Sequence, residues 1–277
     1  MIKSIGILGG TGQMGRMFAK AFREIGCDVI ALGRCSATDE KHLVRESELV
    51  IITVPIHETV SVIRRVRGLL NKHQLFSDFT SVKSHVIPEM LETEASLISC
   101  HPMFGGMNEM SGQNAILLPV NPGKYLKKYQ RLLQDLHLNV VMMADWKKHD
   151  ETMSIIQGLM HFIHIVFSRT LQSRDIDLQT ILSICSPVYQ ANFAFACRIL
   201  QRDPKLYTNI LMDNPENESI LKSFLDEAKQ SFKEITKKDE ETFSERFESC
   251  RDFLGDFGKD FSKQSNFLVE SLQKLST

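Results

Sequence analysis

The first half of the chain alternates short apolar runs with amphipathic segments. An apolar run at 5–8 is followed by a stretch with apolar residues at helical spacing, and a second apolar run comes at 29–32. Apolar runs of this length are typical of buried parallel strands, and their alternation with helical segments predicts a doubly wound parallel sheet of the α/β class. Further runs expected to join this sheet lie at 49–55, 75–80, 97–100, 115–119 and 140–143.

The pattern changes near Trp146. From there to Thr277 the chain has almost no strand signal, and apolar residues recur at helical spacing. We therefore expect two domains: residues 1–146 with the sheet, and residues 147–277 folded as helices only. Pro187 is expected to interrupt the helical pattern, because proline lacks the N–H that a helix interior requires. The long apolar faces of the second domain favour a homodimer with a shared core.

A glycine motif joins the first strand to the first helix. Gly10, Gly12 and Gly15 have the GxGxxG spacing. In this context the first glycine permits a tight turn, the second lets the backbone approach a pyrophosphate, and the third lets helix and strand pack closely. The strand before the motif and the helix after it make this a Rossmann-type dinucleotide site. The cofactor-binding residues expected here are Gly10, Thr11, Gly12, Gln13, Met14 and Gly15.

The end of the second strand bears on the choice of cofactor. An Asp or Glu there hydrogen-bonds the ribose 2′-hydroxyl of NAD in many Rossmann domains. This chain has Gly33 instead, followed by Arg34 and Ser36. Glycine removes the repulsion of a 2′-phosphate, and Arg34 and Ser36 can bind one, so we expect NADP to be favoured, with NAD possible. Val54 and Pro55, after the third strand, are also expected to contact the cofactor.

Composition narrows the possible functions. The chain has 277 residues, is 43% apolar and has a formal net charge of −1, which provides no field for nucleic acid or an acidic membrane. No window resembles a membrane span or a secretory leader. The six cysteines are scattered, with no CxxC pair, so we expect neither a disulfide framework nor a metal site. These features predict a soluble globular protein of the cytoplasm.

His101 is the candidate catalytic residue. It follows an apolar strand and precedes Pro102 and two glycines, and ligands of doubly wound sheets lie outside the carboxyl ends of strands. Histidine accepts protons near neutral pH. A histidine that merely caps the strand is the alternative. Ser81, after the strand at 75–80, lies at the same expected edge.

Several segments, taken together, resemble the prephenate dehydrogenases of the enteric type. They are Gly9–Gly15, Val54-Pro55-Ile56-His57, Thr80-Ser81-Val82-Lys83, His101-Pro102-Met103-Phe104-Gly105, His149-Asp150, His161-Phe162, Ser186–Tyr189, Arg198 and Asp203–Tyr207. The resemblance runs through essentially the whole chain in order. It implies oxidative decarboxylation of prephenate to 4-hydroxyphenylpyruvate in tyrosine biosynthesis.

The resemblance also implies roles for individual residues. His101 matches a catalytic histidine that binds the C4 hydroxyl of the substrate, and Ser81 a serine that touches this hydroxyl and the nicotinamide. Arg198 matches an arginine that binds a substrate carboxylate. His161 and Tyr207 match further substrate-site positions, although a core histidine and a core aromatic residue are their alternatives.

Two departures from the family pattern keep other substrates open. Gln190 replaces a second arginine of many relatives, and Met107 replaces an acid, so arogenate and 4-amino-4-deoxyprephenate are alternative substrates. We expect no fused chorismate mutase domain. A non-catalytic nucleotide sensor would not require Ser81, His101 and Arg198 together. A hydroxyacid dehydrogenase with a catalytic lysine would require a glycine-rich, lysine-bearing helix after Trp146, which the sequence lacks.

Overall fold

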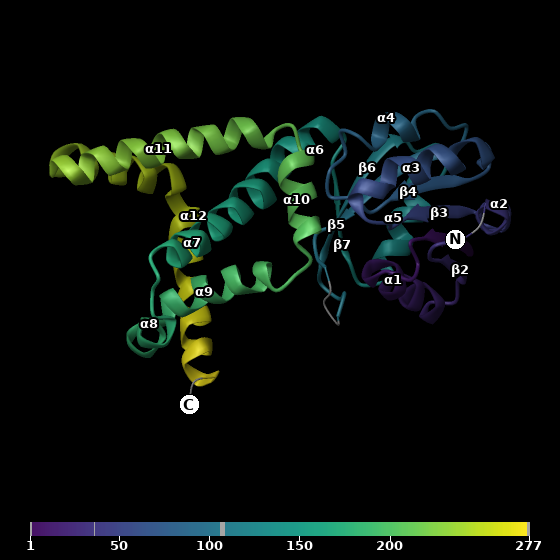
Figure 1. The fold of residues 1–277 in the computed structure, drawn as a ribbon. Coiled ribbons are helices and arrows are strands. Elements are labelled where there is room, and N and C mark those ends of the chain that lie inside the picture. The colour runs from purple at the N-terminus through teal and green to yellow at the C-terminus, as the bar shows by residue number, and fades with distance from the viewer. Residues whose placement is uncertain (1, 36, 106–108, 276–277) are drawn as a thin grey trace. The chain divides into compact units, whose positions relative to one another are not determined.

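A computed structural model describes residues 2–35, 37–105 and 109–275, with side chains up to Ser271 (Figure 1). The chain forms two compact units. The first consists of Met1–Ser154 and Thr208–Pro215, and the second of Ile155–Tyr207 and Glu216–Thr277. Residues 147–154 and 208–215 therefore pack with the unit that contains the sheet. The domain boundary at residue 146 stays a prediction.

The first unit contains a seven-stranded sheet of order β2-β1-β3-β4-β5-β6-β7. All neighbouring strands are parallel except β5 and β6, which pair antiparallel. The α/β fold is therefore confirmed, with one antiparallel pair in the otherwise parallel sheet. The strands are β1 (Ser4–Leu8), β2 (Asp28–Leu32), β3 (Leu49–Ile52), β4 (Leu75–Asp78), β5 (Ser96–Pro102), β6 (Asn114–Asn121) and β7 (Asn139–Met142).

Helices cover both faces of the sheet. Successive side chains of β3 point to opposite faces, and all of them are apolar, so both faces must be covered. Leu49 and Ile51 lie in one core cluster, which includes Phe18 of α1, and Ile52 lies in a second cluster with Ile63 of α3. Because every residue of β3 is fully buried, an unbroken apolar run forms this strand. The helices of this unit are α1 (Gln13–Glu24), α2 (Ala37–Glu46), α3 (Ile56–Val66), the 3₁₀ turn Arg67–Leu69, α4 (Ile87–Met90), α5 (Leu126–Gln134) and α6 (Trp146–Met153).

The strand order creates a crevice for a ligand. β1 lies between β2 and β3. The connection from β1 to β2 runs through α1 on one face of the sheet, and the connection from β2 to β3 runs through α2 on the other face. In open α/β sheets, ligands bind outside the carboxyl ends of the strands at such a switch point.

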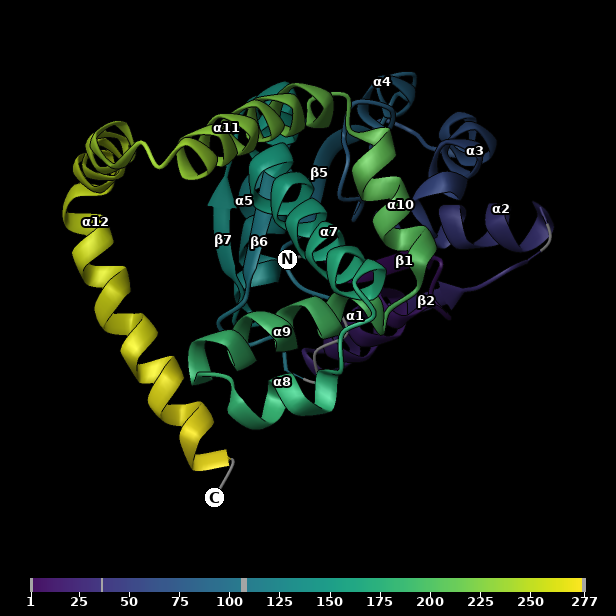
Figure 2. The same cartoon turned by 60° about the vertical axis from the view of Figure 1, so that its left-hand side comes forward.

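Among its described residues, the second unit contains helices and the loops between them, and no strand. Pro187 begins α9, whose first turn is capped by the Ser186 side chain, which accepts the N–H of Tyr189; the predicted interruption is confirmed. α12 is broken at Gly255, where φ is 51°. Among the described residues, no helix is long and apolar enough to cross a membrane. The remaining elements, including α10, which spans both units, are a π-helix (Ser154–Leu159), α7 (Met160–Ser173), α8 (Leu178–Ile184), α9 (Pro187–Leu200), α10 (Pro204–Asp213), α11 (Asn217–Lys237) and α12 (Glu240–Leu275) (Figure 2).

Candidate active site

The turn after β1 depends on a glycine outside the GxGxxG motif. Gly9 has φ of +89°, and a Cβ there would lie 2.6 Å from the carbonyl carbon of Thr53. The left-handed residue after β1 is therefore Gly9, which the sequence prediction did not single out, and Gly10 lies inside the turn that the Gly12 N–H closes on the carbonyl oxygen of Gly9. A Cβ on Gly10 would lie 2.6 Å from Cβ of Ala31, so Gly10 also lets the loop pack against β2.

The other two glycines open the N-terminus of α1. A Cβ on Gly15 would lie 2.3 Å from the carbonyl oxygen of Gly9, whereas a Cβ on Gly12 would meet only that oxygen, at 3.1 Å. Gly12 is the N-cap of α1, and no side chain caps the helix. The first N–H groups of α1 thus lie beside open space, which suits the pyrophosphate of a dinucleotide.

A pocket of about 350 Å³ lies over this loop, at the carboxyl ends of β1, β2 and β3. Its position at the switch point and its size suit a nucleotide. Ser36, also predicted to bind the cofactor, lies outside the described residues. The predicted cofactor residues that line the pocket are Thr11, Gly12, Gly33, Arg34, Val54 and Pro55.

Among the described residues, Arg34 has only a long, solvent-exposed ion pair in the pocket. Its side chain is 97% exposed, and its Nη2 lies 3.8 Å from Oε1 of Glu58. Glu40, in contrast, is buried and accepts hydrogen bonds from Nε and Nη2 of Arg65. The distance from Nη2 to Oε1 of Glu40 is 2.7 Å. The charge of Glu40, which lines the pocket, is thereby balanced by Arg65, and the exposed guanidinium of Arg34 can bind a phosphate.

A buried ion pair fixes the neighbouring ends of β4 and β5. Lys83 and Asp78 have no exposed side-chain surface, and Nζ of Lys83 lies 2.7 Å from Oδ2 of Asp78. Lys83 also donates to the carbonyl oxygen of Cys100 at 2.9 Å, and Asp78 accepts the Ser99 hydroxyl at 2.5 Å. Ser81 follows β4 and is half-buried. The pair therefore ties the loop that carries Ser81 to the strand that carries His101.

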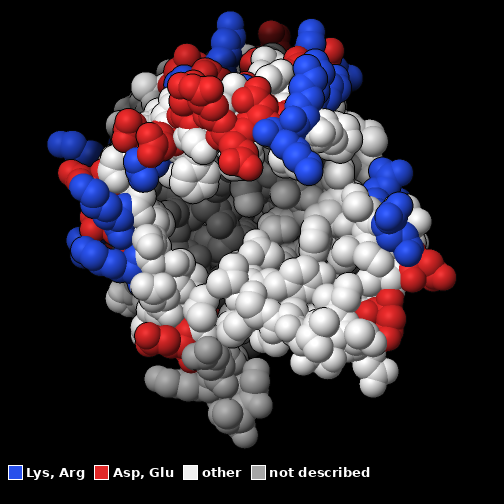
Figure 3. All heavy atoms as spheres, turned by 90° about the vertical axis from the view of Figure 1, so that its left-hand side faces the viewer, with Lys and Arg blue, Asp and Glu red and all other residues white. Residues whose placement is uncertain are grey.

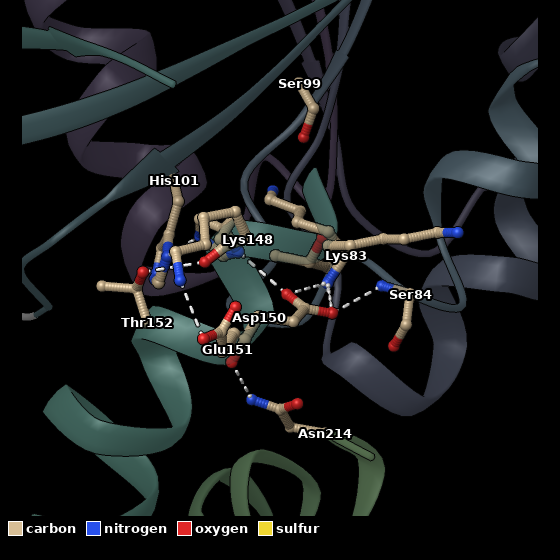
Figure 4. A network of polar contacts seen from close by, with 12 residues as sticks. Lys83, Ser84, Ser99, His101, Lys148, Asp150, Glu151, Thr152 and Asn214 are labelled. Atoms are coloured by element: carbon tan, nitrogen blue, oxygen red, sulfur yellow. Dashed lines mark hydrogen bonds and ion pairs between the residues drawn. The ribbon is translucent and has the colours of Figure 1, made fainter. Parts of the chain in front are cut away.

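His101 belongs to a chain of three buried side chains (Figure 4). It lies inside β5, paired with Ile116 of β6, and does not follow the strand as predicted. Its Nδ1 lies 2.9 Å from Nε2 of His149, whose Nδ1 lies 2.8 Å from Oδ1 of Asp150. The exposed fractions of His101, His149 and Asp150 are 2%, 0% and 1%.

Asp150 is held by the backbone of the segment after β4. Its carboxylate accepts the N–H of Lys83 at 3.0 Å and the N–H of Ser84 at 2.8 Å. In Figure 4 these bonds converge on Asp150, while Asn214 donates to its carbonyl oxygen. Residues from β5, α6 and the end of α10 thus meet at one place.

Burial keeps both histidines neutral. The pKa of His101 is lowered well below 6.5, first by burial and then by the charges of His149 and Lys83. Burial also lowers the pKa of His149, although the hydrogen bond to Asp150 opposes this. A neutral, buried imidazole that is held by a second imidazole can accept a proton from a bound hydroxyl.

In the helical unit the structure brings His161 and Tyr207 together. Their ring centroids lie 5.0 Å apart at 89°. Burial and the charge of His164 lower the pKa of His161 to about 4, and its Nδ1 is buried without a hydrogen-bond partner among the described residues. Burial raises the pKa of Tyr207, while Arg202 and Arg198 lower it. Tyr207 therefore lies beside a neutral histidine, His161, and within range of two positive charges, Arg198 and Arg202.

Arg198 is exposed, and only Ala196 and Ile199 of α9 are buried. The guanidinium of Arg198 is therefore open to a ligand in this chain. Of the apolar residues near it in the sequence, Phe195 and Leu200 are exposed, whereas Ala196 and Ile199 are buried.

The sequence assigned no function to His149, Asp150 or Asp78. His149 contacts His101 across 48 positions of sequence, and no local pattern marks such a contact. The available signal is the dipeptide His149-Asp150 at the start of the first helix after the sheet, since a carboxylate next to a histidine can orient it. In the described residues, no group of three or more His, Cys, Asp or Glu could hold a metal ion.

Two family models match the chain. The nucleotide-binding domain of prephenate dehydrogenase matches residues 25–140, and the dimerization domain of prephenate dehydrogenase matches residues 145–249.

Individual proteins are similar along nearly the whole chain. The T-protein of Haemophilus influenzae is 28% identical over 278 residues, which cover 99% of this chain and 73% of that protein. A probable arogenate/prephenate dehydrogenase of Methanocaldococcus jannaschii is 29% identical over 298 residues, covering 99% of this chain and 67% of the relative. The fold matches a crystal structure of Aquifex aeolicus prephenate dehydrogenase in complex with hydroxyphenyl propionate and NAD⁺, with a TM-score of 0.75, 19% identity, and 93% and 99% of the two chains covered.

Proposed function

Since the chain belongs to the prephenate dehydrogenase family, we propose that it catalyses the oxidative decarboxylation of prephenate to 4-hydroxyphenylpyruvate. The observation that carries this proposal is the buried chain of His101, His149 and Asp150 at the sheet edge that holds the nucleotide pocket. It provides a neutral base where the substrate hydroxyl must be deprotonated.

The Asp150 carboxylate sets the direction of both hydrogen bonds in the series Asp150, His149 and His101. Asp150 accepts two backbone N–H groups, so its Oδ1 faces Nδ1 of His149 as an acceptor, and that nitrogen carries the proton. Nε2 of neutral His149 then has a lone pair and accepts Nδ1–H of His101. Nε2 of His101 is left as its basic nitrogen.

We assign the proton transfer to this nitrogen. The bound nicotinamide supplies a hydride acceptor. As the hydrogen on C4 leaves with its electron pair, Nε2 of His101 takes the proton of the C4 hydroxyl. The bond from C1 to its carboxylate then breaks, CO₂ leaves, the ring becomes aromatic, and the phenolate oxygen regains the proton. Asp150 stabilises the transient positive charge through His149.

Ser81 has the second role at this edge. It lies in the loop that Lys83 and Asp78 anchor, and a serine hydroxyl can both donate and accept a hydrogen bond. We assign it to orient the C4 hydroxyl and the nicotinamide.

Substrate recognition is assigned to Arg198, His161 and Tyr207 of the helical unit. A planar guanidinium suits a carboxylate, and neutral His161 suits the keto group of the side chain. The positive charges of Arg202 and Arg198 lower the pKa of Tyr207. A positively charged environment favours prephenate, a keto acid, over arogenate, which carries an ammonium group. Arogenate and 4-amino-4-deoxyprephenate are the second candidates, because Gln190 replaces an arginine of many relatives.

For the cofactor, a nicotinamide dinucleotide bound at the glycine-rich loop, we propose a preference for NADP over NAD. The absence of a carboxylate at Gly33, the exposed Arg34 and the neutralised Glu40 support this preference. We further propose that the protein works as a homodimer in the cytoplasm, which the match of residues 145–249 to a dimerization domain supports.

The purified protein can be assayed with prephenate, arogenate and 4-amino-4-deoxyprephenate, each with NAD and with NADP. We expect the highest kcat/KM for prephenate with NADP, with 4-hydroxyphenylpyruvate and CO₂ formed in equal amounts. Turnover of another of these substrates without turnover of prephenate would replace the proposed substrate, and no turnover of any would refute the proposed activity.

A further inference from the structure

The nucleotide pocket is lined by two acidic side chains as well as two arginines. They are Glu40, Glu58, Arg34 and Arg65. A carboxylate here bears on the choice of cofactor, because the 2′-phosphate that distinguishes NADP from NAD carries about −1.5 to −2 charges at pH 7. The partner of each acid therefore determines how strongly that acid opposes NADP.

Glu40 is held by Arg65. The Glu40 side chain is 7% exposed. Nε of Arg65 lies 3.3 Å from both of its carboxylate oxygens, and Nη2 lies 2.7 Å from Oε1. A guanidinium that contacts both oxygens of a carboxylate forms a strong pair of fixed geometry. The charges of Glu40 and Arg65 thus balance each other in the wall of the pocket.

Glu58 is the acid that faces Arg34. It lies in the first turn of α3, its side chain is 38% exposed, and its Oε1 lies 3.8 Å from Nη2 of Arg34. The same oxygen lies 3.9 Å from Nε2 of the exposed His57. Both distances exceed that of a hydrogen bond, so the pair of Arg34 and Glu58 is loose and open to water.

We propose that Glu58 is a specificity-determining residue that competes with the 2′-phosphate of NADP for Arg34. This inference rests on the proposed preference for NADP and names the residue that limits it. In the protein without cofactor, Arg34 pairs with Glu58. When NADP binds, the guanidinium turns from the carboxylate to the phosphate. NAD has a hydroxyl at that position, so the pair stays closed when NAD binds.

The strengths of the two contacts support this exchange. An exposed ion pair is weak, because water and salt screen it, whereas a phosphate offers a guanidinium more charge and a two-oxygen contact. Since Arg34 reaches Glu58, a phosphate bound by Arg34 lies near the carboxylate, and charges within about 8 Å still repel at physiological salt. Glu58 therefore weakens NADP binding both through the pair that must open and through repulsion.

Its place in a ligand pocket sets this pair apart from other exposed pairs. Figure 3 shows the side of the molecule on the left in Figure 1, where acidic and basic side chains lie next to each other along the margins of the face. Exposed pairs contribute little to stability. The pair of Arg34 and Glu58, in contrast, lines the space that the cofactor enters, so its opening is coupled to binding.

A role of Glu58 in its own helix is the alternative. An acid in the first turn interacts favourably with the helix dipole, and loss of its charge would then loosen the start of α3. Because Val54 and Pro55 directly precede this helix and also line the pocket, such a change would affect NAD and NADP alike. Selectivity for the phosphate distinguishes the two roles.

Glu58→Gln tests the proposal, because it removes the charge and keeps the size of the side chain. Binding of adenosine 2′,5′-bisphosphate and of 5′-AMP, which differ only in the 2′-phosphate, is measured by titration calorimetry. We expect the Kd of the bisphosphate to fall about five- to tenfold and that of 5′-AMP to change less than about twofold. The matched control is Glu46→Gln, an exposed acid paired with Arg45 on α2, which should change neither Kd.

A double variant tests the part played by Arg34. In the Arg34→Ala background, Glu58→Gln has no pair to release, so its gain in affinity for the bisphosphate should be at least about twofold smaller than in the wild-type background. The same gain in both backgrounds would show that Glu58 acts by repulsion alone, and it would overturn the competition for Arg34.

The outcomes separate this inference from the cofactor preference. A wild type that favours NAD in kcat/KM, with a Glu58→Gln variant that gains affinity for the bisphosphate selectively, removes the preference and supports the role of Glu58. An unchanged Kd for the bisphosphate in Glu58→Gln, or equal gains for the bisphosphate and 5′-AMP, overturns that role whichever cofactor the wild type prefers.

Discussion

Nδ1 of His101 lies 2.9 Å from Nε2 of His149, and both rings are buried. One of these two nitrogens must carry a proton and the other must not, so the protonation of the first ring is set by the second. The proposed chemistry at His101 therefore depends on groups that do not contact the substrate.

The most direct test removes the proposed base. His101→Asn is expected to lower kcat by roughly 10²–10⁴, the usual contribution of a positioned base, while cofactor binding is retained. Turnover is measured with prephenate, and cofactor affinity by fluorescence titration. A variant with nearly normal kcat would show that another group takes the proton.

Asp150→Asn tests the proposed protonation of the rings. The amide can still accept the two backbone N–H groups, but its NH₂ then faces Nδ1 of His149 and reverses the hydrogen bonds along the chain. Nε2 of His101 would hold a proton and could not act as a base, so we expect kcat to fall by about 10²–10⁴, as a reversed histidine tautomer does in a catalytic triad. The control is Glu151→Gln, the neighbouring exposed carboxylate on α6, which should keep normal kcat; equal kcat in the two variants would contradict the relay.

The pH dependence follows from the lowered pKa of His101. The base acts in its neutral form, and burial lowers the pKa well below 6.5. Activity should therefore be lost only as pH falls through that lowered pKa, and kcat/KM should stay constant from mildly alkaline pH down to 6.5. An acid limb centred at or above 6.5 in the pH profile of kcat/KM would contradict the assignment.

Arg34→Ala tests cofactor preference. Loss of a charge-assisted contact to the 2′-phosphate is expected to lower kcat/KM with NADP by about tenfold and to leave NAD nearly unaffected. Arg34 is preferable to Gly33→Asp, because a Cβ on Gly33 would lie 2.3 Å from Oγ1 of Thr11. Arg45→Ala, another exposed arginine, is the control. A wild type that favours NAD tenfold would overturn the preference.

Arg198→Ala is expected to raise KM for prephenate by about 10- to 100-fold and to leave cofactor affinity unchanged. Because Arg198 is exposed in this chain, its removal leaves no buried charge without a partner, and we expect the lower part of the ~2–5 kcal/mol range for truncated charge pairs. Arg174→Ala, an exposed arginine at the C-terminal end of α7, is the control. Equal KM values for the two variants would remove Arg198 from the substrate site.

Periodicity predicted the fold well because the strands contain short apolar runs separated by amphipathic helices, most clearly in β3. Leu49 to Ile52 are all fully buried, and such a run permits few other interpretations. The antiparallel pairing of β6 with β5 could not be predicted, since the direction of a buried strand leaves no mark in its apolar pattern.

The candidate site was predicted in part. The position of His101 near a strand end could be read from the sequence, because the strand and the following glycines are adjacent to it. Its partner His149 comes from α6, and Asp150 is fixed by backbone N–H groups 66 and 67 positions away. Contacts of this range depend on the packed structure, as does the exposure of Arg198.

The residue before His101 has a practical consequence for chemical labelling. Burial raises the pKa of the Cys100 thiol to about 12, so this thiol stays protonated and reacts slowly with alkylating reagents. Cys250 on α12 is exposed. A maleimide dye can therefore be attached to the helical unit of the native enzyme while the thiol next to the catalytic edge stays unmodified.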